Sequence, residues 1–186
     1  MTAPSLISRL STRLGRAARD DSGTSTVEFA ILFPLVISVM LMSYETSIIM
    51  ARQFMLDRAM DIAMRGLRLG SWPEITHAEF KEKVCENVPF GLECSDALAI
   101  EMVPVSKTTW TMPDGAITCV DRTEEIQPVT TFSQGPDNGL MMVRACMTID
   151  PFFPGVGVGL KLDAAPQDGF YLTSTSFFVN EPGTGG

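Results

Sequence analysis

Four cysteines offer the most readily assigned chemistry in this sequence. They are Cys85, Cys94, Cys119 and Cys146, and the C-x2-C and H-x3-H spacings typical of metal sites do not occur. An even number of cysteines favours two disulfides formed in an oxidising compartment. Of the three possible connectivities, the sequence favours Cys85–Cys94 with Cys119–Cys146, because each pair then lies within or between neighbouring elements. Four reduced, buried cysteines are the alternative.

The remaining residues do not form a catalytic pattern. The single histidine, His77, has no histidine partner and is expected to be a solvated residue of a helix start, and neither G-x-S-x-G nor H-E-x-x-H occurs. A hydrolase would depend on acids alone, for example Glu124 and Glu125, which we interpret as part of a solvated loop. The glycine alternation over residues 155–159 is not a phosphate-binding loop, since no Lys-Ser or Lys-Thr follows it. We therefore predict no enzyme, no cofactor and no metal ion.

Composition and charge limit the function further. Hydrophobic residues make up 45% of the 186 residues and charged residues only 19%, which excludes a largely disordered chain. The formal net charge of -8 argues against nucleic acid as a partner. Residues 1–19 nevertheless contain four arginines and no acid. The basic N-terminal segment is therefore expected to serve a different purpose from the acidic remainder of the chain.

An apolar run follows this basic start. Phe29–Tyr44 contains no charged residue, and extension to Ala51 reaches the length of a membrane span but includes Glu45. The arginines in front of the run orient it with its N-terminus in the cytoplasm. Cleavage behind the run is disfavoured because no A-x-A-like site follows it. Glu28, at the start of the run, would be costly in hydrocarbon and therefore signals a function.

The residues at this boundary resemble a known signal. A basic leader, Gly23, and then Glu28 and Phe29 as the fifth and sixth residues after it resemble the class III signal of type IV pilins. More narrowly, G-T-S-T-V-E-F-A-I-L-F-P-L with R-Q-F-M-L-D-R-A-M-D-I-A-M-R resembles the TadE family, minor pilins or pseudopilins of the tight-adherence (Flp pilus) system. The resemblance is dense over residues 20–70 and looser beyond them. It implies that a prepilin peptidase cuts between Gly23 and Thr24.

The resemblance also implies a function for the exposed N-terminus. The Thr24 amine and the Glu28 carboxylate of neighbouring subunits would pair and set subunit register, because an unpaired carboxylate in an apolar filament core is costly. Capping of a helix start is the alternative for Glu28. Phe29 keeps the ring of the tyrosine frequent after this glutamate in major Flp pilins and lacks its hydroxyl.

The implied protein is a minor pilin or pseudopilin needed for assembly of a Tad pilus and for surface adhesion. Its partners would be the prepilin peptidase, other pilins or pseudopilins of the Tad apparatus, and inner-membrane lipid. It would cross the bacterial inner membrane once, with the head in the periplasm or, within a pilus, outside the cell. A membrane-tethered periplasmic hydrolase and a ligand-binding envelope protein are the alternatives.

Periodicity predicts the elements that carry these residues. A helix is expected from about Thr24 to Leu69, ending at Gly70 and kinked at Pro34. Beyond the membrane it should bury one apolar face. That face consists of Leu56, Met60, Ala63 and Leu67.

The rest of the chain predicts a small head. Thr76 and Glu79 have capping-box spacing and open a short helix to about Asn87. Pro113–Gly115 predicts a hairpin turn. Five strands are expected, at Leu98–Val105, Lys107–Met112, Ala116–Asp121, Leu140–Ile149 and Tyr171–Val179.

The expected fold class is therefore α+β and pilin-like, with a long N-terminal transmembrane helix continuing into a small antiparallel-sheet head with disulfides. The expected divisions are a removed leader, 1–23, a transmembrane and spine helix, 24–70, and a head with a mobile tail, 71–186.

Overall fold

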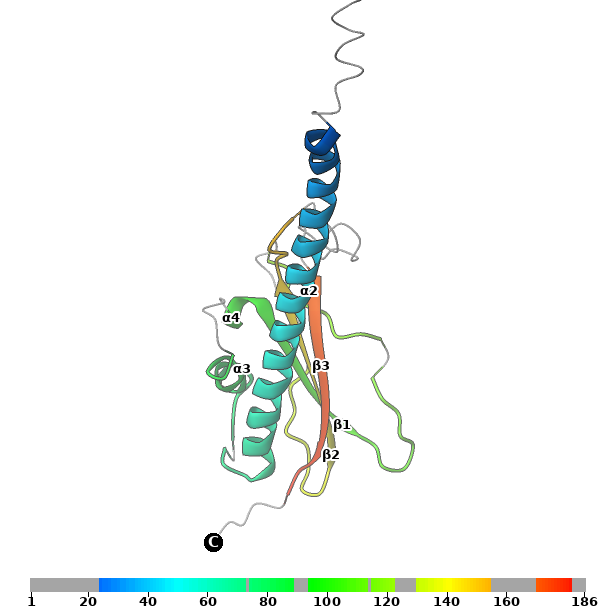
Figure 1. The fold of residues 1–186 in the computed structure, drawn as a ribbon. Helices are drawn as coiled ribbons and strands as arrows, with labels where there is room; N and C mark the ends of the chain where they lie inside the picture. Colours follow the sequence, from blue (N-terminus) through cyan, green and yellow to red (C-terminus); the bar gives the residue numbers. More distant parts are fainter. Residues whose placement is uncertain are drawn as a thin grey trace, which may run out of the picture. The chain divides into compact units, whose positions relative to one another are not determined.

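The computed structural model describes residues 24–72, 74–88, 94–113, 115–122, 130–154 and 170–181 (Figure 1). The chain divides into two compact units, Met1–Leu41 and Met42–Gly186. The leader, the acidic pair at 124–125, the glycine alternation and the end of the C-terminal tail, to which sequence predictions refer, lie outside the described residues.

Helix α2 spans Thr24–Arg68, one residue short of the predicted end. Its C-terminus is closed by Gly70, whose φ of 64° lies in the left-handed region that glycine adopts without strain. The amide of Gly70 donates to the Leu67 carbonyl (3.0 Å) and that of Ser71 to the Gly66 carbonyl (3.0 Å). This pair of bonds is the Schellman motif, so the stop predicted at Gly70 is confirmed.

Helix α3 spans His77–Cys85 and begins with the predicted capping box. The Glu79 amide donates to Thr76 Oγ1 (3.3 Å), and the Thr76 amide donates to Glu79 Oε2 (2.8 Å). The bonds that the Thr76 amide and then Thr76 Oγ1 (2.8 Å) donate to the Glu79 carboxylate hold the pKa of this carboxyl below its usual range. The helix ends two residues before the predicted Asn87, and a single-turn helix, α4 (Cys94–Ala97), leads into the sheet.

Three strands form one antiparallel sheet in the order β1-β2-β3. They are β1 (Leu98–Val105), β2 (Leu140–Ile149) and β3 (Phe170–Val179). Two of them have the predicted bounds, and the third begins one residue earlier than predicted. With α2, the sheet and two disulfides, the α+β fold class is confirmed.

The strand predicted at Lys107–Met112 is wrong. Ser106 Oγ accepts bonds from the amides of Thr108 and Thr109 (both 3.3 Å), which turns the chain immediately after β1. Trp110 then adopts a φ of 53°, which no strand tolerates.

The strand predicted at Ala116–Asp121 is also wrong. This segment lies over a face of the sheet, where Thr148 Oγ1 donates to the Val120 carbonyl (3.0 Å) and Cys119 bonds to Cys146 of the central strand. Residues 131–133, and not this segment, pair with the outer edge of β1. The Met102 amide donates to the Thr131 carbonyl (2.8 Å), and the Ser133 amide donates to the Met102 carbonyl (3.0 Å). The hairpin predicted at Pro113–Gly115 therefore has no strands to connect.

The main core lies between the second part of α2 and one face of the sheet (Figure 1). The helix face predicted from periodicity is buried, which confirms it. The buried helix residues are Leu56, Met60, Ala63 and Leu67. Opposite them, alternate residues of β2 are at most 2% exposed, as expected for one face of a strand. These are Met141, Val143, Ala145, Met147 and Ile149.

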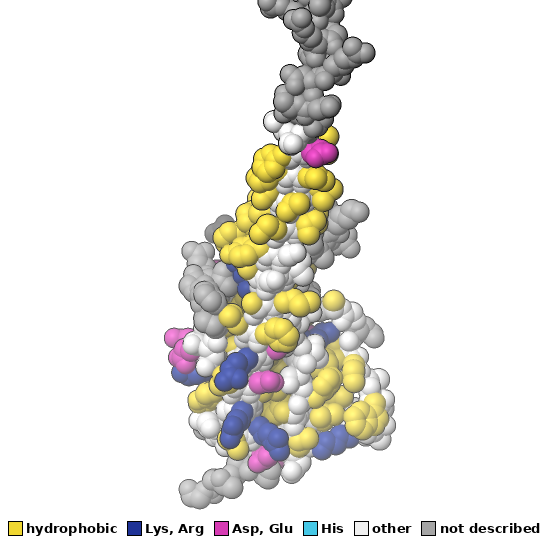
Figure 2. Space-filling model, in the orientation of Figure 1, with side chains coloured by type: hydrophobic (Ala, Val, Ile, Leu, Met, Phe, Trp, Pro, Cys, Tyr) yellow, Lys and Arg dark blue, Asp and Glu magenta, His cyan; other side chains and the backbone are white. Residues whose placement is uncertain are grey.

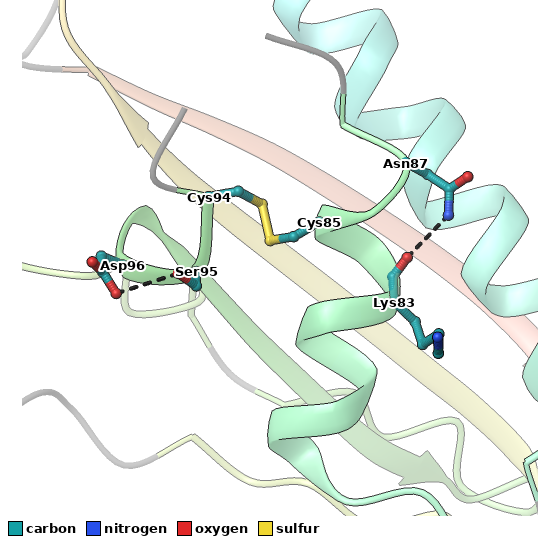
Figure 3. The surroundings of a disulfide bond; sticks show 6 residues. All are labelled: Lys83, Cys85, Asn87, Cys94, Ser95 and Asp96. Atoms are coloured by element: carbon teal, nitrogen blue, oxygen red, sulfur yellow. Dashed lines mark hydrogen bonds between the residues drawn. A yellow bond between two sulfur atoms is a disulfide. The ribbon is translucent and has the colours of Figure 1, made fainter. Parts of the chain in front are cut away.

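Both disulfides favoured by the sequence are present. Cys85–Cys94 joins the end of α3 to the start of α4, with its Cα atoms 5.7 Å apart (Figure 3). Cys119–Cys146 ties the irregular segment after β1 to the central strand, with its Cα atoms 5.3 Å apart. No cysteine is free.

Candidate functional site

Residues 24–41 of α2 expose apolar side chains of a kind that proteins normally bury (Figure 2). Exposure ranges from 49% to 68% for Val27, Phe29, Ile31, Leu32, Phe33, Leu35, Val36, Val39 and Met40. A helix that is apolar on every side fits a lipid or protein environment and not water. Within the described residues, α2 is the one helix long and apolar enough to cross a membrane.

Glu28 is exposed at the start of this apolar segment. Thr24 is the first residue of α2, so Glu28 stands about one helical turn after the proposed new N-terminus. Phe29 is 63% exposed and stacks on Phe33, with ring centroids 5.0 Å apart. Gly23 lies outside the described residues, so the spacing between the glycine and the glutamate is known from the sequence alone.

Glu45 has a position that sequence reasoning missed. Its side chain is only 2% exposed, although it interrupts an apolar stretch. Glu45 Oε1 accepts a bond from the Phe152 amide (2.8 Å), and Oε2 accepts one from the Phe153 amide (3.0 Å). The signal that could have found it is the cost of a buried carboxylate without a partner. That cost does not identify the partner, which is a loop more than a hundred residues away.

Further bonds connect α2 with the end of β2 and with β3. Arg52 Nη1 donates to the Asp150 carbonyl (3.1 Å), and Arg122 Nη1 donates to Asp150 Oδ2 (2.8 Å) in a two-bond ion pair. The bond from Arg122 holds the pKa of Asp150 below its usual range, against the smaller opposing effect of burial. Gln53 Nε2 donates to the Thr173 carbonyl of β3 (3.0 Å). One face of α2 therefore holds the end of β2 and the beginning of β3 together.

His77 is not the solvated residue predicted from the sequence. Its Nε2 lies 3.1 Å from the carbonyl oxygen of Ile100, and its ring centroid lies 5.2 Å from that of Phe132. The side chain therefore joins α3 to β1. No group of three potential metal ligands occurs among the residues that the structure describes.

Comparison with known proteins matches part of the chain to a family. The family model described as TadE-like protein matches residues 23–65. No curated protein and no solved structure matches the chain. The matched residues include Gly23, Glu28 and the apolar segment, and they end within α2, before the sheet and the disulfides begin.

Proposed function

From the match of residues 23–65 to the TadE-like family, we propose that this protein is a structural minor pilin or pseudopilin of a Tad (Flp) pilus system. In this function it is needed for pilus assembly and surface adhesion. The family suggests association with a Tad pilus, and one observation supports the subunit role. That observation is an exposed apolar helix with a carboxylate at its start.

The proposed location is the bacterial inner membrane, crossed once, with the N-terminus in the cytoplasm and the head in the periplasm. The four arginines of residues 1–19 support this orientation. In this proposal the chain divides into a leader (1–23), a membrane and spine helix (24–70) and a head (71–186). The membrane lipid, the prepilin peptidase and other Tad pilins or pseudopilins are its partners.

Processing by the peptidase is expected to remove residues 1–23. Glycine suits the position before the cut because a side chain there would crowd the approach to the backbone. Mass spectrometry of protein extracted from membranes of a strain with the complete Tad apparatus should find Thr24 at the N-terminus. An intact Met1, or a start after Tyr44, would contradict the proposed processing.

Replacing Glu28 with alanine should block assembly while membrane insertion is retained. The change removes a charge from an apolar helix, so insertion becomes easier. It also leaves the Thr24 amine of the neighbouring subunit without its proposed counter-ion. Pili are counted by electron microscopy, and membrane fractions are probed for the subunit.

Glu74→Ala is the matched control, because it removes an exposed acid of the head and should leave piliation unchanged. Normal piliation in the Glu28→Ala strain would contradict the register role and favour simple helix capping.

A further inference from the structure

Three aromatic rings gather where the loop after β2 meets α2. The Tyr44 ring centroid lies 5.9 Å from that of Phe152 and 6.0 Å from that of Phe153, and the two phenylalanine rings are 5.3 Å apart. Tyr44 is 52% exposed and Phe152 is 56% exposed. Tyr44 and Phe152 are therefore held in place but exposed beside the half-buried Phe153, which is typical of a surface that meets an apolar partner.

In the loop after β2, residues 151–154, no backbone amide needs water as a hydrogen-bond partner. Pro151 and Pro154 have no amide hydrogen to donate. The other two residues, Phe152 and Phe153, both donate to the buried carboxylate of Glu45. Every backbone donor of residues 151–154 is thus absent or bonded. Bonded or absent amide donors are one of the conditions for contact with lipid, where a free amide finds no water to bond.

The position of the cluster in the sequence indicates which apolar partner it meets. Tyr44 is the last residue of the charge-free run that begins at Phe29. Charged groups lie at the other end of the cluster, since Arg52 and Arg122 both bond to Asp150, two residues before Phe152. The rings therefore lie between the charge-free run of α2 and the charged groups at Arg52, Arg122 and Asp150. Tyrosine is enriched at the corresponding level of a bilayer, and phenylalanine is common on the apolar face of interfacial helices.

We propose that Tyr44, Phe152 and Phe153, the interfacial aromatic cluster, bind the headgroup–acyl boundary of the membrane and so hold the head against the bilayer. The partner is a phospholipid surface. This inference rests on the proposed membrane anchor, because the cluster reaches the boundary only if residues 24–44 of α2 span the bilayer. Release of the cluster from lipid would then accompany transfer of the subunit from the membrane into a filament.

The test uses fluorescence of the full-length protein in phosphatidylcholine vesicles. Phe152→Trp places a probe in the cluster, and Tyr44→Trp places a second one on the helix side. Phe177→Trp is the control, since Phe177 is also an exposed aromatic residue but lies toward the other end of β3. The emission of the two natural tryptophans, measured in the parent protein, is subtracted.

Lipid brominated near the glycerol end of its acyl chains quenches tryptophans at the boundary. For Phe152→Trp and Tyr44→Trp we expect loss of about half of the added emission, because rings of an aromatic belt sit at headgroup level. The added emission of Phe177→Trp should stay nearly constant.

Flotation of the same vesicles separates this inference from the proposed function. Protein that fails to float contradicts the membrane anchor and with it the cluster's lipid contact. Protein that floats while neither cluster probe is quenched leaves the anchor intact and overturns the lipid-binding surface. Equal quenching of the Phe177→Trp control would also overturn it, because the head would then lie in lipid without preference for the cluster.

Discussion

Replacing Glu45 with alanine is expected to lower the free energy of unfolding of the head by about 3 kcal/mol, because hydrogen bonds to charged groups contribute about 1.5–3 kcal/mol each. The variant removes the acceptors of the Phe152 and Phe153 amides and leaves space at a side chain that is only 2% exposed. Removing the carboxylate also removes the cost of burying its charge. The expected loss of stability is therefore smaller than the largest combined contribution of the two hydrogen bonds. Urea unfolding of the full-length protein in detergent micelles measures the change.

Two variants test whether the effect arises from these bonds. Glu45→Gln keeps the shape and one acceptor oxygen, so it should lose roughly half as much stability. Glu74→Ala removes an exposed acid of the same head and should stay within about 0.5 kcal/mol of the parent. An unchanged unfolding midpoint in Glu45→Ala would show that the carboxylate does not hold the loop.

Exchanging residues 24–41 for an unrelated transmembrane helix is expected to abolish piliation while the protein remains in the membrane. A structural subunit uses the side chains of this helix as a contact surface, whereas a tethered enzyme would need only an anchor of sufficient length. The exchange ends at Leu41 so that Glu45, which bonds to the Phe152 and Phe153 amides of the head, is retained. A longer exchange would destabilise the head and confuse the two effects.

The control for this chimera restores Glu28 alone in the foreign helix. If the carboxylate acts together with the apolar surface around it, this second chimera should also fail to assemble. Pili are counted by electron microscopy, and carbonate extraction confirms insertion. Full piliation in the first chimera would contradict the pilin proposal and favour a tethered enzyme or binding protein, the alternatives considered from the sequence.

Local signals in the sequence were sufficient for several elements. Helix α2 follows from an apolar run joined to a periodic face, and its end follows from Gly70, since only the residues of that turn are involved. The capping box at Thr76 is likewise complete within four residues. Strands β1 and β2 follow from short runs rich in apolar residues, and the disulfide pairings follow from cysteines placed in or beside these elements.

Tertiary structure decided the features whose partners are far apart in the chain. Residue propensity alone predicted a strand at Ala116–Asp121. In the structure, Thr131–Ser133 bonds to the edge of β1, and Ala116–Asp121 lies over a face of the sheet instead. In the same way, a glutamate inside an apolar run predicts only that some partner must offset its burial. The carboxylate oxygens of Glu45 accept hydrogen bonds from the amides of Phe152 and Phe153, which lie 107 and 108 residues further along the chain. Composition and periodicity therefore determined which segments are helical, apolar or extended, because those properties depend on neighbouring residues. Folding determined which segment Glu45 holds and which aromatic rings stay exposed, because those properties depend on packing between distant parts of the chain.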